Sequence, residues 1–272
     1  MATATATATL TRPSALGSAR RTGTILIKEA KYEFLKNLRL PMYSFATIGF
    51  PVMFYILFGI VMGHQEMPGM SLATYLIASY GTFGVMGASL YGTGSGLASE
   101  RGMGWLQVKR ASPMPPSAYF AGKIVMSMIF SAVVVFILLA LGMTLGGVRM
   151  GAVSLIELVA VLVGGSLPFC ALGLAIAYFV GPNSVSATIN LIYLPMAFCS
   201  GLWIPFMFLP KPIQQFAHLL PSYHLSQLAL GVIGRDRGEA MNAHWFALIA
   251  FTLICLGLAL IGYRRDESKL YG

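Results

Sequence analysis

Charged residues divide the chain into long apolar stretches, and this alternation is the strongest pattern in the sequence. No Asp, Glu, Lys or Arg occurs in 40–63, 67–99, 124–148, 158–210 and 240–263. A helix that crosses the hydrocarbon of a membrane needs roughly 20 apolar residues. The stretch 158–210 holds enough residues for two such helices, with a turn at the helix-breaking cluster Gly181–Ser184. The pattern predicts an all-α membrane protein with six transmembrane helices over 41–63, 71–97, 122–146, 154–180, 185–206 and 243–263.

The positive charges indicate how these helices are oriented. If the N-terminus is cytoplasmic, 14 of the 18 Lys and Arg residues fall in cytoplasmic segments and four fall outside. Cytoplasmic segments of membrane proteins carry an excess of Lys and Arg. We therefore expect a protein of the plasma (inner) membrane with both termini in the cytoplasm. Residues 99–121 then form the first cytoplasmic loop, and 266–272 form a cytoplasmic tail.

Two further segments have a pattern of their own beside the spans. Residues 1–24 are of low complexity and are expected to be a disordered cytoplasmic tail. Residues 25–40 alternate apolar and basic positions, which favours an interfacial helix at the membrane surface, although a plain charged flank remains the alternative. Residues 203–234 are too apolar for an ordinary exposed loop, and their prolines forbid one long helix. Short re-entrant helices before the last span are expected there, on the outer side.

Composition and motifs exclude several classes of function. The chain is 57% hydrophobic and 10% charged, and its net charge of +9 is spread in short blocks between apolar stretches, which argues for membrane orientation and against nucleic-acid binding. Three cysteines within apolar stretches favour neither a disulfide framework nor a metal site. The sequence contains no G-x-x-x-x-G-K-[ST], so no P-loop nucleotide site is expected in this chain.

Glu157 is the acidic residue that falls clearly inside a predicted span. An ionisable residue there is a candidate for substrate contact or for an interface. It lies near the outer end of the fourth span, where a carboxylate can reach water, so a packing or interfacial role is the alternative. A single peripheral carboxylate is a poor basis for a proton relay, which disfavours a stand-alone carrier.

Two groups of residues form recognisable motifs. The first group lies at the start of the loop 99–121 and comprises Glu100, Arg101, Gly102, Gly104, Trp105 and Leu106. The second group comprises Gly201, Leu202, Trp203, Ile204, Pro205, Pro221, Tyr223 and His224. The first resembles the E-R-x-x-G-x-L start of the coupling helix, and the second the "GLWIP … LPxYHL" stretch of the outer re-entrant helices, in the permease subunit of an ABC type-2 exporter of the multidrug-resistance kind. The resemblance covers roughly residues 25–265.

The resemblance implies a function for the whole chain. It implies two paired permeases, either a homodimer or two paralogues, above two separate cytoplasmic ATPase subunits that carry the ATP and Mg. The chain itself would then be a transport subunit and no enzyme, and would bind no cofactor. Its short helix after Glu100 and Arg101 would lay Trp105, Leu106 and Val108 into a groove of the ATPase.

The apolar spans favour an amphiphilic drug-like or lipid-like substrate that leaves the cell. An exporter of polysaccharide or another cell-envelope polymer is the alternative within the class. A stand-alone membrane carrier or a membrane enzyme is the alternative from another class.

Overall fold

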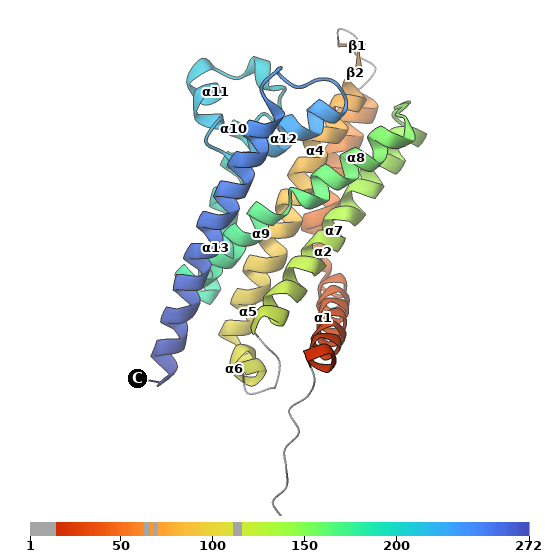
Figure 1. Ribbon diagram of the computed structural model, residues 1–272. Coiled ribbons are helices and arrows are strands. Elements are labelled where there is room, and N and C mark those ends of the chain that lie inside the picture. The colour runs from red at the N-terminus through yellow and green to blue at the C-terminus, as the bar shows by residue number, and fades with distance from the viewer. Residues whose placement is uncertain (1–14, 63–65, 68–69, 111–115, 272) are drawn as a thin grey trace, which may run out of the picture.

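The computed structural model describes residues 15–62, 66–67, 70–110 and 116–271, and these residues form a helical bundle. Helix α1, helix α6 and the C-terminal end of α13 lie at one end of it, which we call the α6 end (Figure 1). Helices α11 and α12 and the β1–β2 hairpin lie at the opposite end, the α11 end. The strands β1 (Glu66–Met67) and β2 (Met70–Ser71) are two residues each, so the fold is helical in all but this hairpin.

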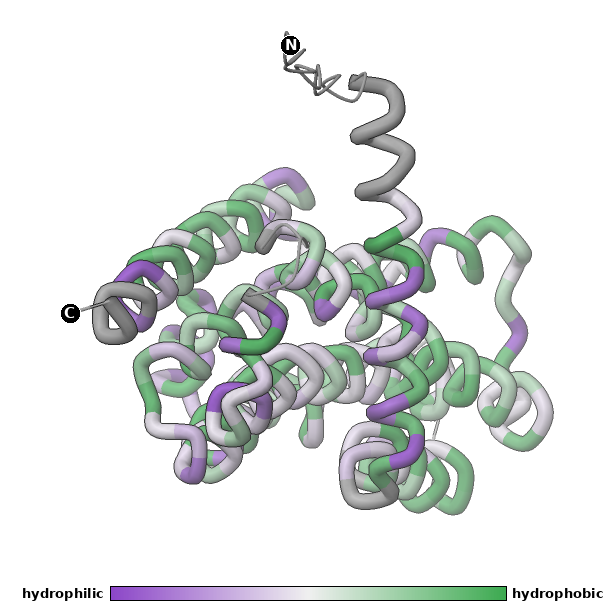
Figure 2. The backbone as a smooth tube through the Cα atoms, turned by 90° about the horizontal axis from the view of Figure 1, so that it is seen from below, coloured by the Kyte–Doolittle hydropathy of each residue, from purple (hydrophilic) through white to green (hydrophobic). Residues whose placement is uncertain are grey.

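Helix α1 (Ala15–Leu38) runs beside the bundle at the α6 end and covers most of the predicted interfacial segment 25–40. It begins within the segment that was expected to be a disordered tail, since the chain is already helical from Ala15 onward. Residues 1–14 of that tail lie outside the described residues. Hydrophilic and hydrophobic positions alternate along this helix when the molecule is viewed from the α6 end (Figure 2).

The first predicted span is a single helical rod in which α-helical and π-helical turns alternate. Its parts follow one another without a break, because the residues at each junction keep right-handed helical dihedral angles. Pro51 lies at the junction of η1 and α3, where it has no N–H to donate to the preceding turn of the rod. The parts are α2 (Pro41–Ser44), η1 (Phe45–Gly49), α3 (Phe50–Phe54) and η2 (Tyr55–Val61).

The second predicted span lies at the centre of the bundle and continues directly towards the α6 end. Ser71 caps its first turn by accepting a hydrogen bond from the backbone N–H of Thr74 at 3.3 Å. Gly94 approaches the next layer so closely that an added Cβ would lie 3.1 Å from the carbonyl oxygen of Gly173. The helices of this rod are α4 (Leu72–Ser89), η3 (Leu90–Ser95) and α5 (Gly96–Gly102).

The next stretch carries the chain twice along the bundle and then into a tight turn. Helix α7 (Pro116–Thr144) begins at a proline, which is well suited to the first position of a helix. The predicted fourth span is divided in two between Gly164 and Leu167. The predicted turn at Gly181–Ser184 is confirmed as a 3-10 turn, η4 (Pro182–Ser184). The remaining helices here are α8 (Ala152–Gly164), α9 (Leu167–Phe179) and α10 (Val185–Cys199).

The predicted re-entrant segment folds into short helices at the α11 end (Figure 1). Helix α10 ends at Cys199, earlier than predicted, because Gly201 turns the chain with a φ of +75° that other residues rarely adopt. The segment then packs back against the bundle and leads into the last helix. Its elements are η5 (Phe206–Phe208), α11 (Lys211–Ala217), α12 (Pro221–Val232) and α13 (Met241–Tyr271).

Among the described residues, three helices are long and apolar enough to cross a membrane: Ser117–Thr144, Ala152–Phe179 and Met241–Asp266. The first predicted span contributes a shorter apolar helix, Thr47–Val61. The predicted all-α fold class is therefore confirmed apart from the short hairpin, while the re-entrant position of the helices before α13 stays a prediction. The number of spans stays a prediction, because the second rod is rich in Gly, Ser and Thr and the fifth helix is short.

Candidate functional site

Helix α6 (Trp105–Arg110) lies at the α6 end, within the predicted loop 99–121, and is joined to α5 by a tight turn. Gly104 makes this turn with a φ of +74°, which explains why the sequence has glycine there. Trp105 is 55% exposed, whereas Leu106 is only 6% exposed and packs in the main apolar core of the molecule. The expected apolar face of Trp105, Leu106 and Val108 is therefore corrected, because Leu106 points inward.

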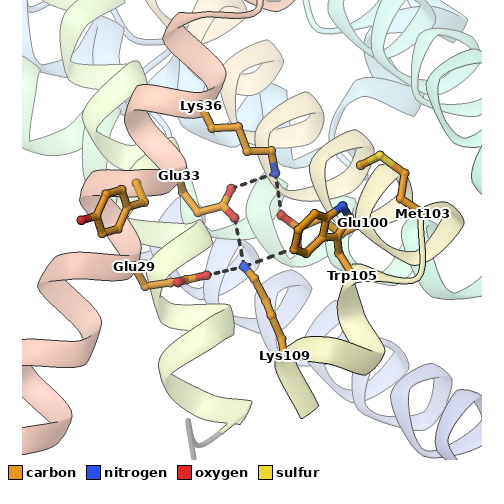
Figure 3. Close-up of a pocket in the computed structure, with 8 residues that line it drawn as sticks. Glu29, Glu33, Lys36, Glu100, Met103, Trp105 and Lys109 are labelled. Atoms are coloured by element: carbon orange, nitrogen blue, oxygen red, sulfur yellow. Dashed lines mark hydrogen bonds and ion pairs between the residues drawn. The ribbon is translucent and has the colours of Figure 1, made fainter. Parts of the chain in front are cut away.

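The exposed apolar face of α6 is completed by two neighbours of Trp105. Met103 and Val108 are both well exposed, and Met103 and Trp105 border the same pocket of about 370 Å³ (Figure 3). An exposed cluster of large apolar side chains is typical of a docking surface for another protein. Pro113 and Pro115, which follow α6 in the sequence, lie outside the described residues.

The other walls of this pocket are charged and connect α1 with the chain on both sides of α6. Glu100 Oε1 accepts a hydrogen bond from Lys36 Nζ at 2.5 Å and lies 3.2 Å from Lys123 Nζ. Lys123 is fully buried, and its second carboxylate neighbour is Glu33 Oε1 at 3.3 Å. We call the whole set the charge network; it comprises Glu29, Glu33, Lys36, Glu100, Lys109 and Lys123.

Lys109 is the member of the charge network that belongs to α6 itself. Its Nζ contacts Glu29 Oε1 and lies 3.4 Å from Glu33 Oε1 and 3.7 Å from Glu100 Oε2 (Figure 3). Burial alone would lower the pKa of Lys109, but the hydrogen bond to Glu29 and the surrounding carboxylates outweigh it and raise that pKa. The α6 helix is thus held to α1 by a cation that stays charged.

Electrostatics also keep Glu100 ionised despite its burial. Burial raises the pKa of Glu100, but the positive charges of Lys123 and Lys36 and the hydrogen bonds at its carboxylate outweigh this and hold the pKa well below its usual range. Tyr119 donates a further hydrogen bond to Oε2 at 2.5 Å. Three carboxylates and three ammonium groups balance one another in the charge network, so the charged groups here are paired.

Arg101, the second residue of the predicted coupling motif, contacts α9 and α13 and is not part of the exposed apolar face of α6. Its guanidinium donates to Asp266 Oδ1 at 2.8 Å and to the backbone carbonyl of Ala177. Gly102 follows at a close approach, since an added Cβ would lie 3.2 Å from Pro182 Cβ. The six residues of the predicted motif therefore divide into an exposed Trp105, a buried Leu106 and Glu100, an inward Arg101 and two glycines at tight positions.

A second candidate site is a cavity of about 820 Å³ among the first, second and fifth predicted spans. Its aromatic walls are arranged in pairs: Phe83 stacks on Tyr193 at 4.8 Å between ring centroids, and Phe54 stacks on Trp203 at 5.8 Å. The described residues that line it include no Asp, Glu, Lys or Arg. The cavity suits a ligand that is largely apolar and presents flat faces.

Polar groups are gathered on η3 and α10 at one part of this cavity. Tyr91 donates a hydrogen bond to Asn190 Oδ1, and the hydroxyl oxygens of Ser95 and Ser186 lie 3.0 Å apart. These side chains also line the cavity. An apolar cavity with a few convergent polar groups is the usual form of a small-molecule site, because the polar groups orient the ligand.

The predicted outer motif divides between this cavity and the α11 end. Trp203 lines the cavity, while Leu202 is buried in the main core and Ile204 is exposed. Pro205 immediately precedes η5, and Pro221 is the first residue of α12.

The last two residues of the outer motif form polar contacts at the start of the last helix. Tyr223 is buried and donates a hydrogen bond to Glu239 Oε1 at 2.8 Å. His224 Nδ1 and His244 Nδ1 lie 2.8 Å apart. The motif residues of the α12 segment therefore fasten α12 to the beginning of α13.

Glu157 lies on the exposed side of α8 and does not line the aromatic cavity. Among the described residues, no group of three or more His, Cys, Asp or Glu side chains is arranged to hold a metal ion. The cysteines within that part of the chain are free thiols.

Sequence reasoning missed most of the charge network and most of the aromatic cavity. Glu29 and Glu33 are four residues apart, so they share one face of α1, and this spacing was the available signal for an inward-facing acidic stripe. Lys123 directly precedes the apolar stretch 124–148, and its contacts with Glu33 and Glu100 were not predicted. The aromatic residues of the cavity come from three distant segments, and no local pattern brings them together.

Two comparisons bear on this arrangement of sites. The family model described as "ABC-2 type transporter" matches residues 29–233, from α1 through α12. The chain is also 23% identical over 244 residues to "Putative transport permease YvfS" of Bacillus subtilis (strain 168), and this covers 90% of the chain and 99% of that protein. The matched region contains the exposed face of α6, the charge network and the aromatic cavity. The chain belongs to the ABC-2 type transporter family.

Proposed function

We propose that this protein is the permease subunit of an ATP-driven exporter that moves an amphiphilic drug-like or lipid-like molecule out of the cell. Separate cytoplasmic ATPase subunits bind the ATP and the Mg, and they dock on α6. A second permease, a copy or a paralogue, completes the path across the plasma (inner) membrane. Both termini and the α6 end are cytoplasmic, and six spans and the re-entrant helices α11 and α12 form the membrane domain.

The observation that carries this proposal is that α6 is exposed on one face and anchored to the rest of the bundle by the other. Its outer face presents Trp105 and Val108, next to the exposed Met103 in the preceding turn, while its inner face is fixed by Leu106 in the core and by Lys109 in the charge network. A helix held in this way moves as one body with α1, α5 and α7. Force applied by an ATPase to the exposed face would therefore reach the spans directly, as transport coupling requires.

The aromatic cavity supports the choice of substrate. Its stacked rings and uncharged lining favour an apolar molecule with one polar end, which the Tyr91–Asn190 pair can orient. The same stacked aromatic rings could hold the flat faces of sugars, so an exporter of polysaccharide or another cell-envelope polymer is the second candidate. A charged polymer would find no counter-charge among the described lining residues.

Transport by the reconstituted complex tests the proposal. The chain would be co-expressed with a candidate ABC ATPase subunit from the same organism, and uptake of amphiphilic dyes into inside-out vesicles would be followed with and without ATP. We expect ATP-dependent uptake that requires both subunits. Trp203→Ala and Asn190→Ala should lower it about tenfold or more, since each removes a contact of the size that decides specificity. Full-rate transport without any ATPase would overturn the proposal, and transport of an oligosaccharide alone would favour the second candidate.

A further inference from the structure

Arg101 occupies a position that docking on an ATPase does not explain. It lies on α5, immediately before the turn into α6, yet its side chain is only 15% exposed. Its two terminal nitrogens bind different helices: one donates to Asp266 Oδ1 on α13 at 2.8 Å, and the other donates to the carbonyl of Ala177 on α9. The guanidinium carbon also lies 5.3 Å from the centre of the Tyr178 ring. One side chain thus joins three helices.

The carbonyl of Ala177 needs such a partner because of where α9 ends. Helix α9 stops at Phe179, and Val180 is already extended, with φ −110° and ψ 144°. The last carbonyls of a helix have no N–H of the next turn to bind, so they require a donor from elsewhere. Arg101 supplies that donor, and a planar guanidinium can do so while it still faces a carboxylate.

Asp266 is held at a fixed distance from α9 by the packing of α13. An added Cβ at Gly262, one turn before Asp266, would lie 2.5 Å from the Cβ of Tyr178, so the two helices are in close contact there. Tyr263 packs edge-on against Tyr178 at 6.0 Å and against Phe120 of α7 at 5.7 Å. The end of α13 is therefore packed tightly against α9, and Arg101 adds a direct polar connection from α5 to both helices.

We infer that Arg101 is a positioning residue that fastens the segment before α6 to the ends of α9 and α13. This inference rests on the proposed function of α6 as the docking helix. A displacement of α6 then reaches the last span through Asp266, in addition to the spans that flank α6 in the chain. Trp105 provides the contact with the ATPase, and Arg101 transmits the displacement of α6 to α9 and α13.

Hydrogen exchange of the purified permease tests the fastening without any ATPase. Arg101→Lys keeps the charge but cannot bind both acceptors in the same geometry, and Asp266→Asn removes the carboxylate charge. Each should make the backbone amides of 258–266 exchange about tenfold faster, because the local opening becomes easier. Combining the two should add little, since both break one contact. The exchanged pair Arg101→Asp with Asp266→Arg should restore most of the protection, and Arg149→Lys, a matched change in an exposed loop, should alter nothing.

Either of two results of this experiment would overturn the inference. One is unchanged exchange at the end of α13 in Arg101→Lys, and the other is fully additive effects of the two single changes. Additive effects would mean that Arg101 and Asp266 act on the helix independently.

The reconstituted complex distinguishes a failure of this inference from a failure of the proposed function. Arg101→Lys should bind the ATPase with wild-type affinity but move about tenfold fewer substrate molecules per ATP hydrolysed. Trp105→Ala should instead weaken ATPase binding. If the wild-type chain binds no ATPase, the proposed function fails while the exchange result stands. If Arg101→Lys weakens ATPase binding as much as Trp105→Ala, Arg101 is a docking residue and the inference is wrong.

Discussion

At the scale of single residues, Trp105 and Leu106 show how neighbours in one short helix serve different purposes. Trp105 is exposed and Leu106 is buried in the core, although both are apolar and adjacent. The proposed docking role therefore rests on Trp105 with Met103 and Val108, whereas Leu106 contributes to the stability of the fold. These roles predict separate effects of substitution.

Trp105→Ala should weaken binding of the ATPase without lowering the stability of the permease. A tryptophan at the centre of an interface commonly contributes about 2 kcal/mol or more to binding, which corresponds to at least roughly thirtyfold in affinity. Leu106→Ala should instead lower the free energy of unfolding by about 2–4 kcal/mol, since it leaves a cavity in the core. Binding of the purified ATPase and thermal unfolding in detergent measure the two effects. An equal loss of stability in both variants would contradict this division.

Glu100→Gln should destabilise the protein strongly at neutral pH. It leaves Lys36 and the buried Lys123 with too little negative charge, and breaking a buried ion pair in this way costs about 3–5 kcal/mol. Because the pKa of Glu100 is lowered in the folded protein, its contribution is complete above the unfolded value of about 4.3 and is lost as the pH falls below it.

Unfolding midpoints of wild type and Glu100→Gln, measured between pH 7 and pH 3, should therefore approach each other in acid. Glu157→Gln provides the control, because Glu157 is exposed on α8. If the midpoints of wild type and Glu100→Gln fall in parallel across this range, Glu100 is not the group whose protonation lowers the stability.

At the scale of elements, the sequence predicted helices well and their interruptions poorly. The apolar stretches predicted the helical segments, and the cluster at Gly181–Ser184 predicted the turn, because both signals lie within one short stretch of sequence. The π-helical turns η1 and η2 were not predicted, since they depend on how the rod packs against α4. The charge network was also missed, because it joins α1 to residues more than sixty positions away. Such pairings are decided by tertiary contacts.

The contact between α12 and α13 at the α11 end should weaken in mild acid. Two Nδ1 atoms can share a hydrogen bond only if one of them carries no proton, so the His224–His244 contact requires a neutral ring. Burial lowers the pKa of His224, and the nearby His244 and His218 lower it further, although the carbonyl of His218 and Glu239 act in the opposite direction.

The folded protein thus favours neutral His224, and its stabilisation is complete above the unfolded pKa of about 6.5 and is lost as the pH falls below that value. Thermal unfolding and exchange of the amides in 221–232, measured at pH 7.5 and pH 5.5, should show this loss in wild type. His224→Gln should show a smaller dependence on pH. If the stability of that variant depends on pH as strongly as that of wild type, the loss in acid is due to groups other than His224.

At the scale of the whole molecule, the α6 end and the α11 end should face opposite sides of the membrane. Single cysteines at Val108 and Arg235, both exposed, mark the two ends. In a background with the partly exposed Cys199 replaced by Ser, a membrane-impermeant thiol reagent should label position 235 in intact cells and position 108 only after lysis. The reverse pattern would overturn the orientation expected from the Lys and Arg distribution.

The balance of the charge network has an evolutionary consequence. Lys36 on α1 and Glu100 on α5 are partners across 64 positions of sequence, and a change of Lys36 alone leaves the buried carboxylate of Glu100 with one counter-charge fewer. Substitutions should therefore be accepted in pairs as relatives diverge, and the two positions should covary. Exposed positions such as Val108 have no such constraint and should drift together only with the surface of the ATPase that meets them.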